Sequence, residues 1–588
     1  MPFWNSRSLL SKSSRAKTFC IFLLAAFGAA CGGGGNNGSS SNNPPPNSNI
    51  TVSVSPVSVT VAPSGTVQFT ATVTGTTNST VMWTATASDG SGANVGIISA
   101  SGLYTAPGTP PNPSIVNIKA TSVADATKSG SATVNVLVHH SNQDAQSAPI
   151  KLGTSGGNTT DQTTTTDPNT GKREVFCCSG TLGSLVSRGG DLFILSNNHV
   201  LDKSDQGAVG DPISQPGLAD TNCGQSANII VANLSQAAPL KTSNVDAAIA
   251  KVIPNQVDPS GTILDLAGPG QPAPPSSQIA APAVNQLVAK SGDATGLTCS
   301  SIASIDTPVS VKYQTQCQGG TTFSVTFQHQ LVITGGNFSN SGDSGSLIVT
   351  TDGAQPVGLL YAGSPNSTVA HPIGDVLTAL KDPNSSEVPK IVGGANHPVI
   401  CPAAAQSVEA AASAHVEMRL SREELQQADT MLELHRSELM SNPAVFDLGI
   451  GQSSDNPKEP AILVSVTNHP EIPLPVQVGG IRTKIIEAKA SEEPVRNPVP
   501  ISQAEVMRAK AVKDRHAEAM MTNPAILGVG IGASLDNTGE SALVVYVEKG
   551  KRVNVPIEIE GVRTRIFETE PFRAFNWGKR TRNSCSRR

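Results

Sequence analysis

Alternating apolar and polar residues characterise residues 50–138. β-branched and polar residues alternate in runs such as Thr51–Ser55 and Val67–Val73, and short turn-forming segments separate these runs. A period of two buries one face of a strand and leaves the other face in solvent. The pattern therefore predicts a small antiparallel β-sandwich.

After Lys390 the pattern becomes helical and then repeats. Residues 407–439 are rich in Ala, Glu and Arg with helical periodicity, and a second helix is predicted over Gln503–Met521. Two blocks recur at a constant offset of 81 residues: Asn442–Gly451 as Asn523–Gly532, and Gly480–Thr483 as Gly561–Thr564. Each copy continues with short strands, so we expect two small α/β repeats. Polar loop and strand follow the G-I-G glycines, which excludes a dinucleotide-binding turn.

The composition limits the possible functions. The chain has 588 residues, of which 14% are charged, and a formal net charge of −5. This length requires several domains, and the near-neutral charge excludes a nucleic-acid binder. No cysteine and histidine spacing matches a zinc site, and neither a metal nor another cofactor is expected.

The first 31 residues have the features of an export signal. Basic residues precede the apolar segment Phe19–Phe27, which is too short to span a membrane, and small residues lead to Cys31. Cys31 resembles the acylated cysteine of bacterial lipoprotein signals. Gly28 stands where that motif usually has leucine, so ordinary signal-peptidase cleavage is the alternative. The resemblance implies a lipid anchor in a bacterial membrane, and hence a location in the cell envelope or outside the cell.

The sequence contains a candidate nucleophile, Ser344. It lies in the glycine-rich turn Asn340–Ser346, directly before the apolar run Leu347–Val349. Such a turn can expose the serine hydroxyl and aim the backbone N–H groups of Gly342 and Ser344 at a developing oxyanion. A serine hydroxyl needs a general base near neutral pH, and the base needs an acid to orient it.

His199 and Asp246 are the candidate partners of Ser344. His199 follows an apolar segment, and Asp246 is a lone acid in an apolar run, where a buried carboxylate needs a partner such as an imidazole N–H. The chain order His, Asp, Ser is that of the chymotrypsin-type triad. Three other acids follow the histidine and remain alternatives: Asp202, Asp211 and Asp220. Two further histidines of this region are interpreted as packed or solvent-facing: His329 and His371.

Six sequence blocks in this order resemble the chymotrypsin-fold serine peptidases, and among them the trypsin-like group related to the plant NARROW LEAF protein. The blocks are L-S-N-N-H-V-L, G-D-P-I-S-Q-P-G, V-D-A-A-I-A, K-S-G-D-A-T-G-L-T, G-D-S-G-S-L-I-V and P-V-G-L-L-Y-A-G-S. The resemblance covers about residues 165 to 390. It implies a double β-barrel with His199 as general base, Asp246 as its orienting acid and Ser344 as nucleophile in the cleft between the barrels.

The same resemblance bears on specificity. The position six residues before the nucleophile often forms the base of the primary pocket in such enzymes, and Phe338 occupies it here. Phe338 is not an acid that would attract Arg or Lys, which argues against a trypsin-like preference.

The regions on either side suggest auxiliary roles. Residues 50–138 resemble bacterial immunoglobulin-like domains, and we interpret them as a spacer in preference to an adhesive surface. The two repeats look like small α/β modules found beside peptidases of the same group. A docking or inhibitory role is preferred for them over a purely structural one.

The cysteines are consistent with export. The chain has 9, of which Cys20 and Cys31 belong to the signal region. Cys299 and Cys317 are expected to end two strands flanking a turn and are the best candidate pair, with Cys223 to Cys177 or Cys178 as a weaker one. The odd number outside the signal region leaves at least one thiol free or paired between chains.

The sequence thus predicts a mainly β, multidomain protein: a sandwich, a double barrel and two α/β repeats. The expected segments are a signal (1–31), a linker (32–49), an immunoglobulin-like domain (50–138), a linker (139–167), the peptidase domain (168–390), repeat 1 (407–487), repeat 2 (502–568) and a basic tail (569–588). The expected function is a membrane-tethered serine endopeptidase acting on protein or peptide substrates. The alternative is a surface adhesion or scaffold protein with a degenerate peptidase-like domain, and the presence of all three triad residues favours the enzyme.

Overall fold

The computed structural model describes residues 50–574 with short gaps. The gaps are residues 62–64, 89–94, 108–110, 112–113, 137–139, 167–170, 172, 225–227, 318, 403–419, 467–472, 488–499 and 538. The predicted export signal, the predicted lipidation site Cys31 and most of the basic tail lie outside the described residues. Among the described residues, no helix is long and apolar enough to cross a membrane.

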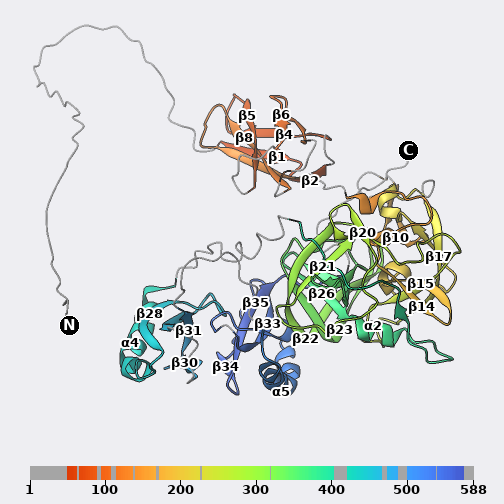
Figure 1. Cartoon of the computed structure of the whole chain (residues 1–588). Coiled ribbons are helices and arrows are strands. Elements are labelled where there is room, and N and C mark those ends of the chain that lie inside the picture. The colour runs from red at the N-terminus through yellow and green to blue at the C-terminus, as the bar shows by residue number, and fades with distance from the viewer. Residues whose placement is uncertain are drawn as a thin grey trace, which may run out of the picture.

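Residues 51–136 form three small sheets around one core (Figure 1). The sheets are β1 (Thr51–Ser55) with β4 (Thr70–Thr74); β2 (Ser58–Val61), β9 (Ser129–Val136), β8 (Ile115–Ser122) and β5 (Val81–Ala87); and β3 (Thr66–Gln68), β7 (Leu103–Thr105) and β6 (Ile97–Ile98). The period-two pattern places alternate residues inside, so that Val116, Ile118 and Ala120 of β8 are all fully buried. The immunoglobulin-like assignment of this region stays a prediction.

An eight-stranded antiparallel sheet begins the central region. In sheet order it contains β13 (Gly180–Leu182), β10 (Thr154–Asn158), β16 (Pro212–Gln215), β17 (Ile229–Ala237), β18 (Ala248–Val252), β15 (Asp191–Ser196), β14 (Ser184–Arg188) and β27 (Lys390–Ile391). The short helices η1 (Ser141–Gln143), η2 (Leu218–Thr221) and α1 (Asn198–Leu201) and the hairpins β11 (Gln162–Thr166)–β12 (Arg173–Cys177) and β19 (Ile263–Gly268)–β20 (Gln271–Ala273) accompany it. The β15–β18 pair matters most for the site, because its ends carry His199 and Asp246.

Six further strands close on themselves in the second half of the central region. They are β21 (Leu287–Gly292), β24 (Leu347–Thr350), β25 (Pro356–Ser364), β26 (Ser367–Pro372), β23 (Gly319–Thr334) and β22 (Gly296–Gln316), and β22 pairs back onto β21. This closure uses Gly296–Ser301 of β22, and the part of β22 that follows is left to pair with another strand. The helix α2 (Ile373–Ala379) follows β26. This mainly β arrangement agrees with the predicted fold class at the level of a curled, barrel-like sheet.

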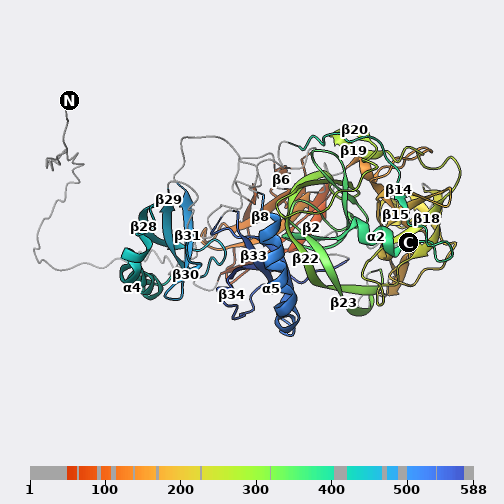
Figure 2. The same ribbon diagram turned by 60° about the horizontal axis from the view of Figure 1, so that its bottom comes forward.

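Repeat 2 extends this sheet. Its strands β32 (Ile526–Ala533), β33 (Ser541–Glu548), β35 (Val562–Thr569) and β34 (Glu558–Ile559) continue from β22, because β32 pairs with β22 in antiparallel register. The helix α5 (Gln503–Met521) covers them, and the side chain of Ser502 caps its N-terminus. Figure 1 and Figure 2 both show repeat 2 between the central region and repeat 1.

Repeat 1 forms a separate sheet from β28 (Val445–Gln452), β29 (Pro460–Val466), β31 (Ile481–Glu487) and β30 (Gln477–Val478), with the helix α4 (Arg422–Leu439) packed on it. Ser421 and Glu424 form a capping box at the start of α4. Both repeats have the predicted helix followed by strands, and each has one further long strand after its glycine turn, β31 or β35, that the sequence did not predict.

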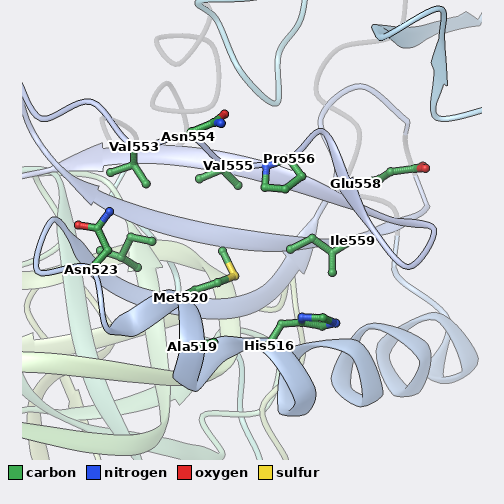
Figure 3. A pocket seen from close by; sticks show the side chains of 11 residues that line it. His516, Ala519, Met520, Asn523, Val553, Asn554, Val555, Pro556, Glu558 and Ile559 are labelled. Carbon is green, nitrogen blue, oxygen red and sulfur yellow. The ribbon is translucent and has the colours of Figure 1, made fainter.

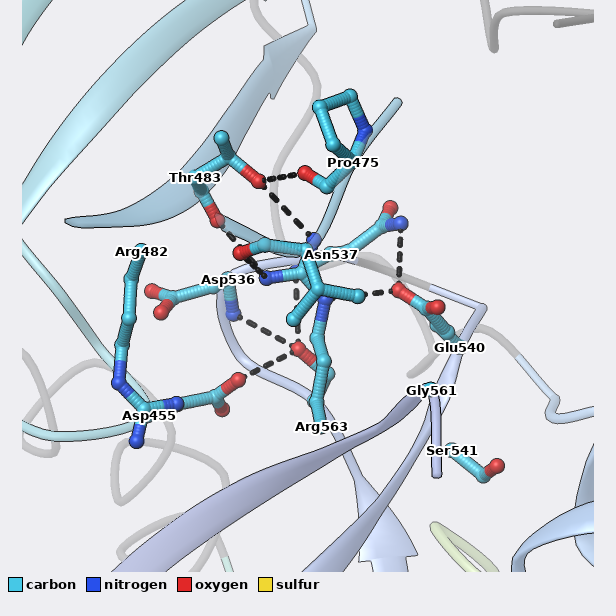
Figure 4. A network of polar contacts seen from close by, with 12 residues as sticks. Asp455, Pro475, Arg482, Thr483, Asp536, Asn537, Glu540, Ser541, Gly561 and Arg563 are labelled. Carbon is cyan, nitrogen blue, oxygen red and sulfur yellow. Dashed lines mark hydrogen bonds and ion pairs between the residues drawn. The ribbon is translucent and has the colours of Figure 1, made fainter. Parts of the chain in front are cut away.

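The two repeats contact each other through equivalent residues (Figure 4). Arg482 donates to the backbone oxygen of Thr564 at 2.8 Å, and Arg563 donates to that of Thr483 at 2.8 Å. The same reciprocity holds for two serine–aspartate pairs: Ser453 with Asp536 at 2.5 Å, and Ser534 with Asp455 at 2.7 Å. Each partner differs from its counterpart by the repeat offset, so the copies meet in an isologous, two-fold-like interface within one chain.

The predicted Cys299–Cys317 disulfide is wrong. The structure has Cys177–Cys223, Cys178–Cys317 and Cys299–Cys401, with Cα–Cα distances of 5.6, 5.6 and 5.9 Å. Cys299 lies near the start of β22 and Cys317 just beyond its end, so the region is one long strand where two strands and a turn were expected. Eighteen extended residues span up to roughly 60 Å, which a disulfide cannot bridge. The weaker pairing of Cys223 with Cys177 is confirmed.

Candidate active site

His199 and Asp246 meet because of the register between two strands. Ser196 at the end of β15 lies opposite Ala248 at the start of β18, so the residues just beyond these ends become neighbours. The Nδ1 atom of His199 lies 2.5 Å from Oδ2 of Asp246, and the His199 backbone N–H donates to Oδ1 at 3.1 Å. Both side chains are fully buried. The carboxylate therefore fixes the position of the imidazole at two points.

Asparagines in the L-S-N-N-H block hold the turn that carries His199. The side-chain amide of Asn197 donates to the backbone oxygen of Asp246 at 2.7 Å, and that of Asn198 donates to the backbone oxygen of Ala238 at 2.9 Å. Both side chains are fully buried, and these bonds satisfy side-chain N–H groups that would otherwise cost free energy. The block thus specifies the loop as well as the imidazole.

Two further side chains complete the surroundings of Asp246. The hydroxyl of Tyr313 donates to Oδ2 at 2.8 Å, and the backbone N–H of Asp246 donates to Nε2 of His371 at 2.8 Å. Burial alone would raise the pKa of Asp246, but its interactions with His199 hold that pKa below its usual value. Burial lowers the pKa of His371 to about 3, so its neutral ring can accept this hydrogen bond. Asp246 is thereby kept as a carboxylate.

The other candidate acids have different partners. Asp211 accepts from Asn158 at 2.9 Å, and Asp220 accepts from Ser155 at 2.5 Å. Burial raises the pKa of Asp202 to about 6. His329 is an exposed partner of Asp306, as expected for a solvent-facing histidine. His371 is packed as expected, but sequence reasoning missed its contact with Asp246, as it missed Tyr313.

Ser344 lies on the turn between β23 and β24. This turn packs against the last residue of β15, Ser196. Gly342 and Gly345 have positive φ angles of 105° and 93°. A Cβ atom on Gly345 would lie 2.1 Å from Oγ of Ser196, so only glycine fits there. Ser196 is three residues before His199, and this close approach brings the serine turn to the side of the molecule that carries the imidazole.

The backbone around Ser344 is held on both sides. Its carbonyl accepts from the N–H of Thr181 at 2.8 Å, and the Gly345 N–H donates to the oxygen of Leu360 at 2.8 Å. Within the described part of the chain, the N–H groups of Gly342 and Ser344 have no protein acceptor. The sequence analysis predicts that these two N–H groups bind the oxyanion.

Asp343, which precedes Ser344, pairs with a buried lysine. Oδ1 of Asp343 lies 3.3 Å from Nζ of Lys290, and both side chains are fully buried. The same carboxylate accepts from the backbone N–H groups of Asn340 at 2.8 Å and Ala294 at 2.9 Å. Burial lowers the pKa of Lys290, whereas Asp343 opposes that shift. Because an unpaired charge here would be costly, the pair fixes the turn in its observed shape.

Two oxygen atoms approach the Ser344 hydroxyl. Oγ lies 3.5 Å from the backbone oxygen of Tyr361 in β25 and 3.5 Å from the backbone oxygen of Ala574, near the end of the described chain. Phe338, the predicted base of the primary pocket, is 2% exposed and packs in an apolar cluster with Ile302, Ile348 and other residues.

A pocket of about 470 Å³ lies in repeat 2, between α5 and the loop before β34 (Figure 3). His516, Met520 and Ile559 are among its lining residues, and none of His199, Asp246 or Ser344 lines it. Among the described residues, no group of three or more His, Cys, Asp or Glu side chains could hold a metal ion.

No protein-family model matches the chain, and no curated protein matches it. Solved structures do match, at a distance. The resemblance is to chymotrypsin-fold serine proteases. A glutamic acid specific serine protease, described as using a novel histidine triad in substrate binding, is 18% identical over 41% of this chain and 100% of its own, with a TM-score of 0.28. The chymotrypsin of Cellulomonas bogoriensis is 16% identical over 38% of this chain and 94% of its own, with a TM-score of 0.24.

Proposed function

We propose that this protein is a serine endopeptidase in which Ser344 is the nucleophile, His199 the general base and Asp246 its orienting acid. The observation that carries the proposal is the buried 2.5 Å contact between Nδ1 of His199 and Oδ2 of Asp246. This contact fixes the tautomer that leaves Nε2 available to accept a proton, and it stabilises the imidazolium that forms. A second support is the glycine turn that carries Ser344. In this turn the backbone N–H groups of Gly342 and Ser344 have no protein acceptor among the described residues.

The proposed reaction follows from these roles. Oγ of Ser344 attacks the carbonyl carbon of a peptide bond while Nε2 of His199 takes its proton. The N–H groups of Gly342 and Ser344 stabilise the oxyanion, and His199 returns the proton to the leaving amine. Water then hydrolyses the acyl-enzyme by the same path in reverse order. Phe338 at the predicted pocket base supports a preference other than Arg or Lys.

The same proposal places the enzyme outside the cytoplasm. Three disulfides are typical of proteins from an oxidising compartment, extracellular or in the envelope. Acylation at Cys31, proposed from the sequence, would tether it to a membrane. A single acyl chain binds only marginally, so stable anchoring would need the two or more chains of a lipoprotein.

Hydrolysis of an unfolded protein substrate tests the activity. Ser344→Ala is expected to reduce turnover by about 10⁴-fold or more, because only the Oγ atom can form the acyl-enzyme. Ser341→Ala, in the same turn, is the matched control and is expected to keep wild-type turnover. Equal hydrolysis by wild type and Ser344→Ala would refute Ser344 as the nucleophile, and no hydrolysis by wild type would favour the degenerate, adhesive alternative.

A further inference from the structure

The C-terminal segment, defined here as Glu570–Ala574, runs from the end of repeat 2 to the Ser344 hydroxyl. Its starting point is fixed by Thr569 at the end of β35, whose hydroxyl lies 2.7 Å from Oγ of Ser364 and 2.7 Å from Oδ1 of Asn366. Ser364 ends β25, and Asn366 lies in the turn between β25 and β26. The segment therefore enters the central region directly beside the strand that borders Ser344.

Phe572 anchors the C-terminal segment. Its side chain is fully buried in the cluster that also holds Tyr313, Tyr361 and Tyr546, and its ring centroid lies 6.0 Å from that of Tyr546. Burial of an aromatic side chain contributes strongly to binding. Ala574 is also buried, at 2% exposure, whereas the side chain of Arg573 between them is exposed. The alternation is that of an extended strand with one face inside.

The backbone of the C-terminal segment pairs with strands on both sides. Arg573 exchanges two hydrogen bonds with Gly363 of β25, of 3.0 and 3.1 Å, in antiparallel register. On the other side, the N–H of Lys312 in β22 donates to the oxygen of Phe572 at 3.0 Å, and the N–H of Ala574 donates to the oxygen of Lys312 at 3.2 Å. Strand addition of this kind is a general mode of peptide recognition. It carries the carbonyl oxygen of Ala574 to 3.5 Å from Oγ of Ser344, which donates a hydrogen bond to it.

We propose that the C-terminal segment is the first substrate of the Ser344 site, and that the chain cuts itself after Ala574. This inference rests on the proposed peptidase function and adds a substrate to it. Oγ of Ser344 forms an ester with the Ala574 carbonyl carbon, and its proton passes through His199 to the nitrogen of Phe575 as the Ala574–Phe575 bond breaks. Water then hydrolyses the ester, which regenerates Ser344 and leaves a carboxylate on Ala574. One water molecule is consumed and residues 575–588 are released.

The docking also defines a substrate class. The site takes an extended peptide bound through its main chain. The residue whose carbonyl carbon is attacked is small and buried, the residue before it is exposed, and the residue before that is aromatic. Ala574, Arg573 and Phe572 fill these three positions in the chain itself. Added peptides with the sequence Phe-Arg-Ala before the bond are therefore expected to be better substrates than peptides with Ala in place of Phe.

Intact-mass measurement of the purified full chain tests self-cleavage. Wild type is expected to lack residues 575–588, and Ser344→Ala is expected to retain them. Arg573→Ala keeps the backbone N–H and is the reference for Arg573→Pro. Arg573→Pro removes the N–H that donates to Gly363, and loss of that one hydrogen bond should slow cutting about tenfold. Ser344→Ala mixed with wild type should keep its tail, because the cut occurs within one chain.

Several results would overturn the proposal. Wild type that hydrolyses an added protein but retains residues 575–588 would refute self-cleavage and leave the proposed function intact. Loss of the tail from Ser344→Ala would assign the cut to another protease, and equal rates for Arg573→Pro and Arg573→Ala would refute the docked register. Retention of the tail together with inactivity on added substrate would refute both proposals.

Discussion

At the scale of single residues, the site depends on how one buried carboxylate is satisfied. Asp246 accepts from the His199 ring, the His199 backbone N–H and the Tyr313 hydroxyl. An ionised carboxylate without such donors would be protonated or would destabilise the fold. The donors therefore serve two purposes: they keep Asp246 charged, and they direct that charge at the imidazole.

Removing the Tyr313 hydroxyl tests this account. Tyr313→Phe deletes one charge-assisted hydrogen bond of about 1.5–3 kcal/mol, so the pKa of Asp246 should rise and kcat/KM at neutral pH should fall about tenfold or more. Tyr546→Phe is the matched control, because Tyr546 is equally buried but its hydroxyl contacts Ser304, at 2.7 Å. Both variants should lose stability, and only Tyr313→Phe should lose activity. Equal kcat/KM for the two variants would contradict the role of Tyr313.

The sequence allowed the residues with motif context to be predicted, and not those whose contacts depend on tertiary structure. His199, Asp246 and Ser344 each lie in a recognisable block. Tyr313 and His371 lie in strands whose alternating pattern says only that they are buried or exposed. Their contact with Asp246 arises because distant strands converge, and no local pattern encodes that convergence.

At the scale of secondary-structure elements, β22 explains both a wrong prediction and a new contact. Two strands flanking a turn were expected between Cys299 and Cys317, but one strand with bulges in its pairing to β23 runs from Gly296 to Gln316. The length of β22 allows it to pair with β21, β23 and β32 along different parts. Sequence periodicity indicates a strand, and it does not indicate which strands will pair with it.

The pairing of β22 with β32 depends on Gly530. The equivalent glycine of repeat 1, Gly449, provides a control for testing this dependence. A Cβ atom on Gly530 would lie 2.1 Å from Oγ1 of Thr307 in β22, whereas one on the equivalent Gly449 of repeat 1 would lie 4.0 Å from the nearest side-chain atom. Gly530→Ala is expected to destabilise this pairing by about 1–3 kcal/mol, as overpacking of a filled interface does. Gly449→Ala should be nearly neutral.

Limited proteolysis and thermal unfolding report on that pairing. Gly530→Ala should make the linker before repeat 2 more sensitive to protease and lower the midpoint of unfolding relative to Gly449→Ala. If the two variants unfold alike, repeat 2 is not held to the central region through this strand pair.

At the scale of the whole molecule, duplication has produced two repeats with different environments. Repeat 1 has an edge strand, β28, that is partly exposed, whereas the equivalent β32 is buried along its full length between β22 and β33. The offset of the copies could be read from the sequence, as could their helices. Their reciprocal pairing through Arg482 and Arg563 could not, because an arginine in a repeat gives no sign of a buried partner in the other copy.

Repeat 2 also connects the periphery of the molecule to the candidate active site. It joins the central region through β32, and its last strand leads into the C-terminal segment that ends beside Ser344. A docking or inhibitory role was expected for the repeats from sequence. The C-terminal segment provides a mechanism for an inhibitory role, because it lies beside Ser344 and an added substrate must compete with it.

Labelling with a fluorophosphonate probe, followed by peptide mapping, tests the central claim most directly. The account predicts a single adduct on Ser344 in the wild-type chain, and a labelling rate about 10⁴-fold lower in His199→Ala, because the hydroxyl then has no base. An adduct on a different residue, no adduct in the chain cut after Ala574, or equal labelling of Ser344 in wild type and His199→Ala would contradict it.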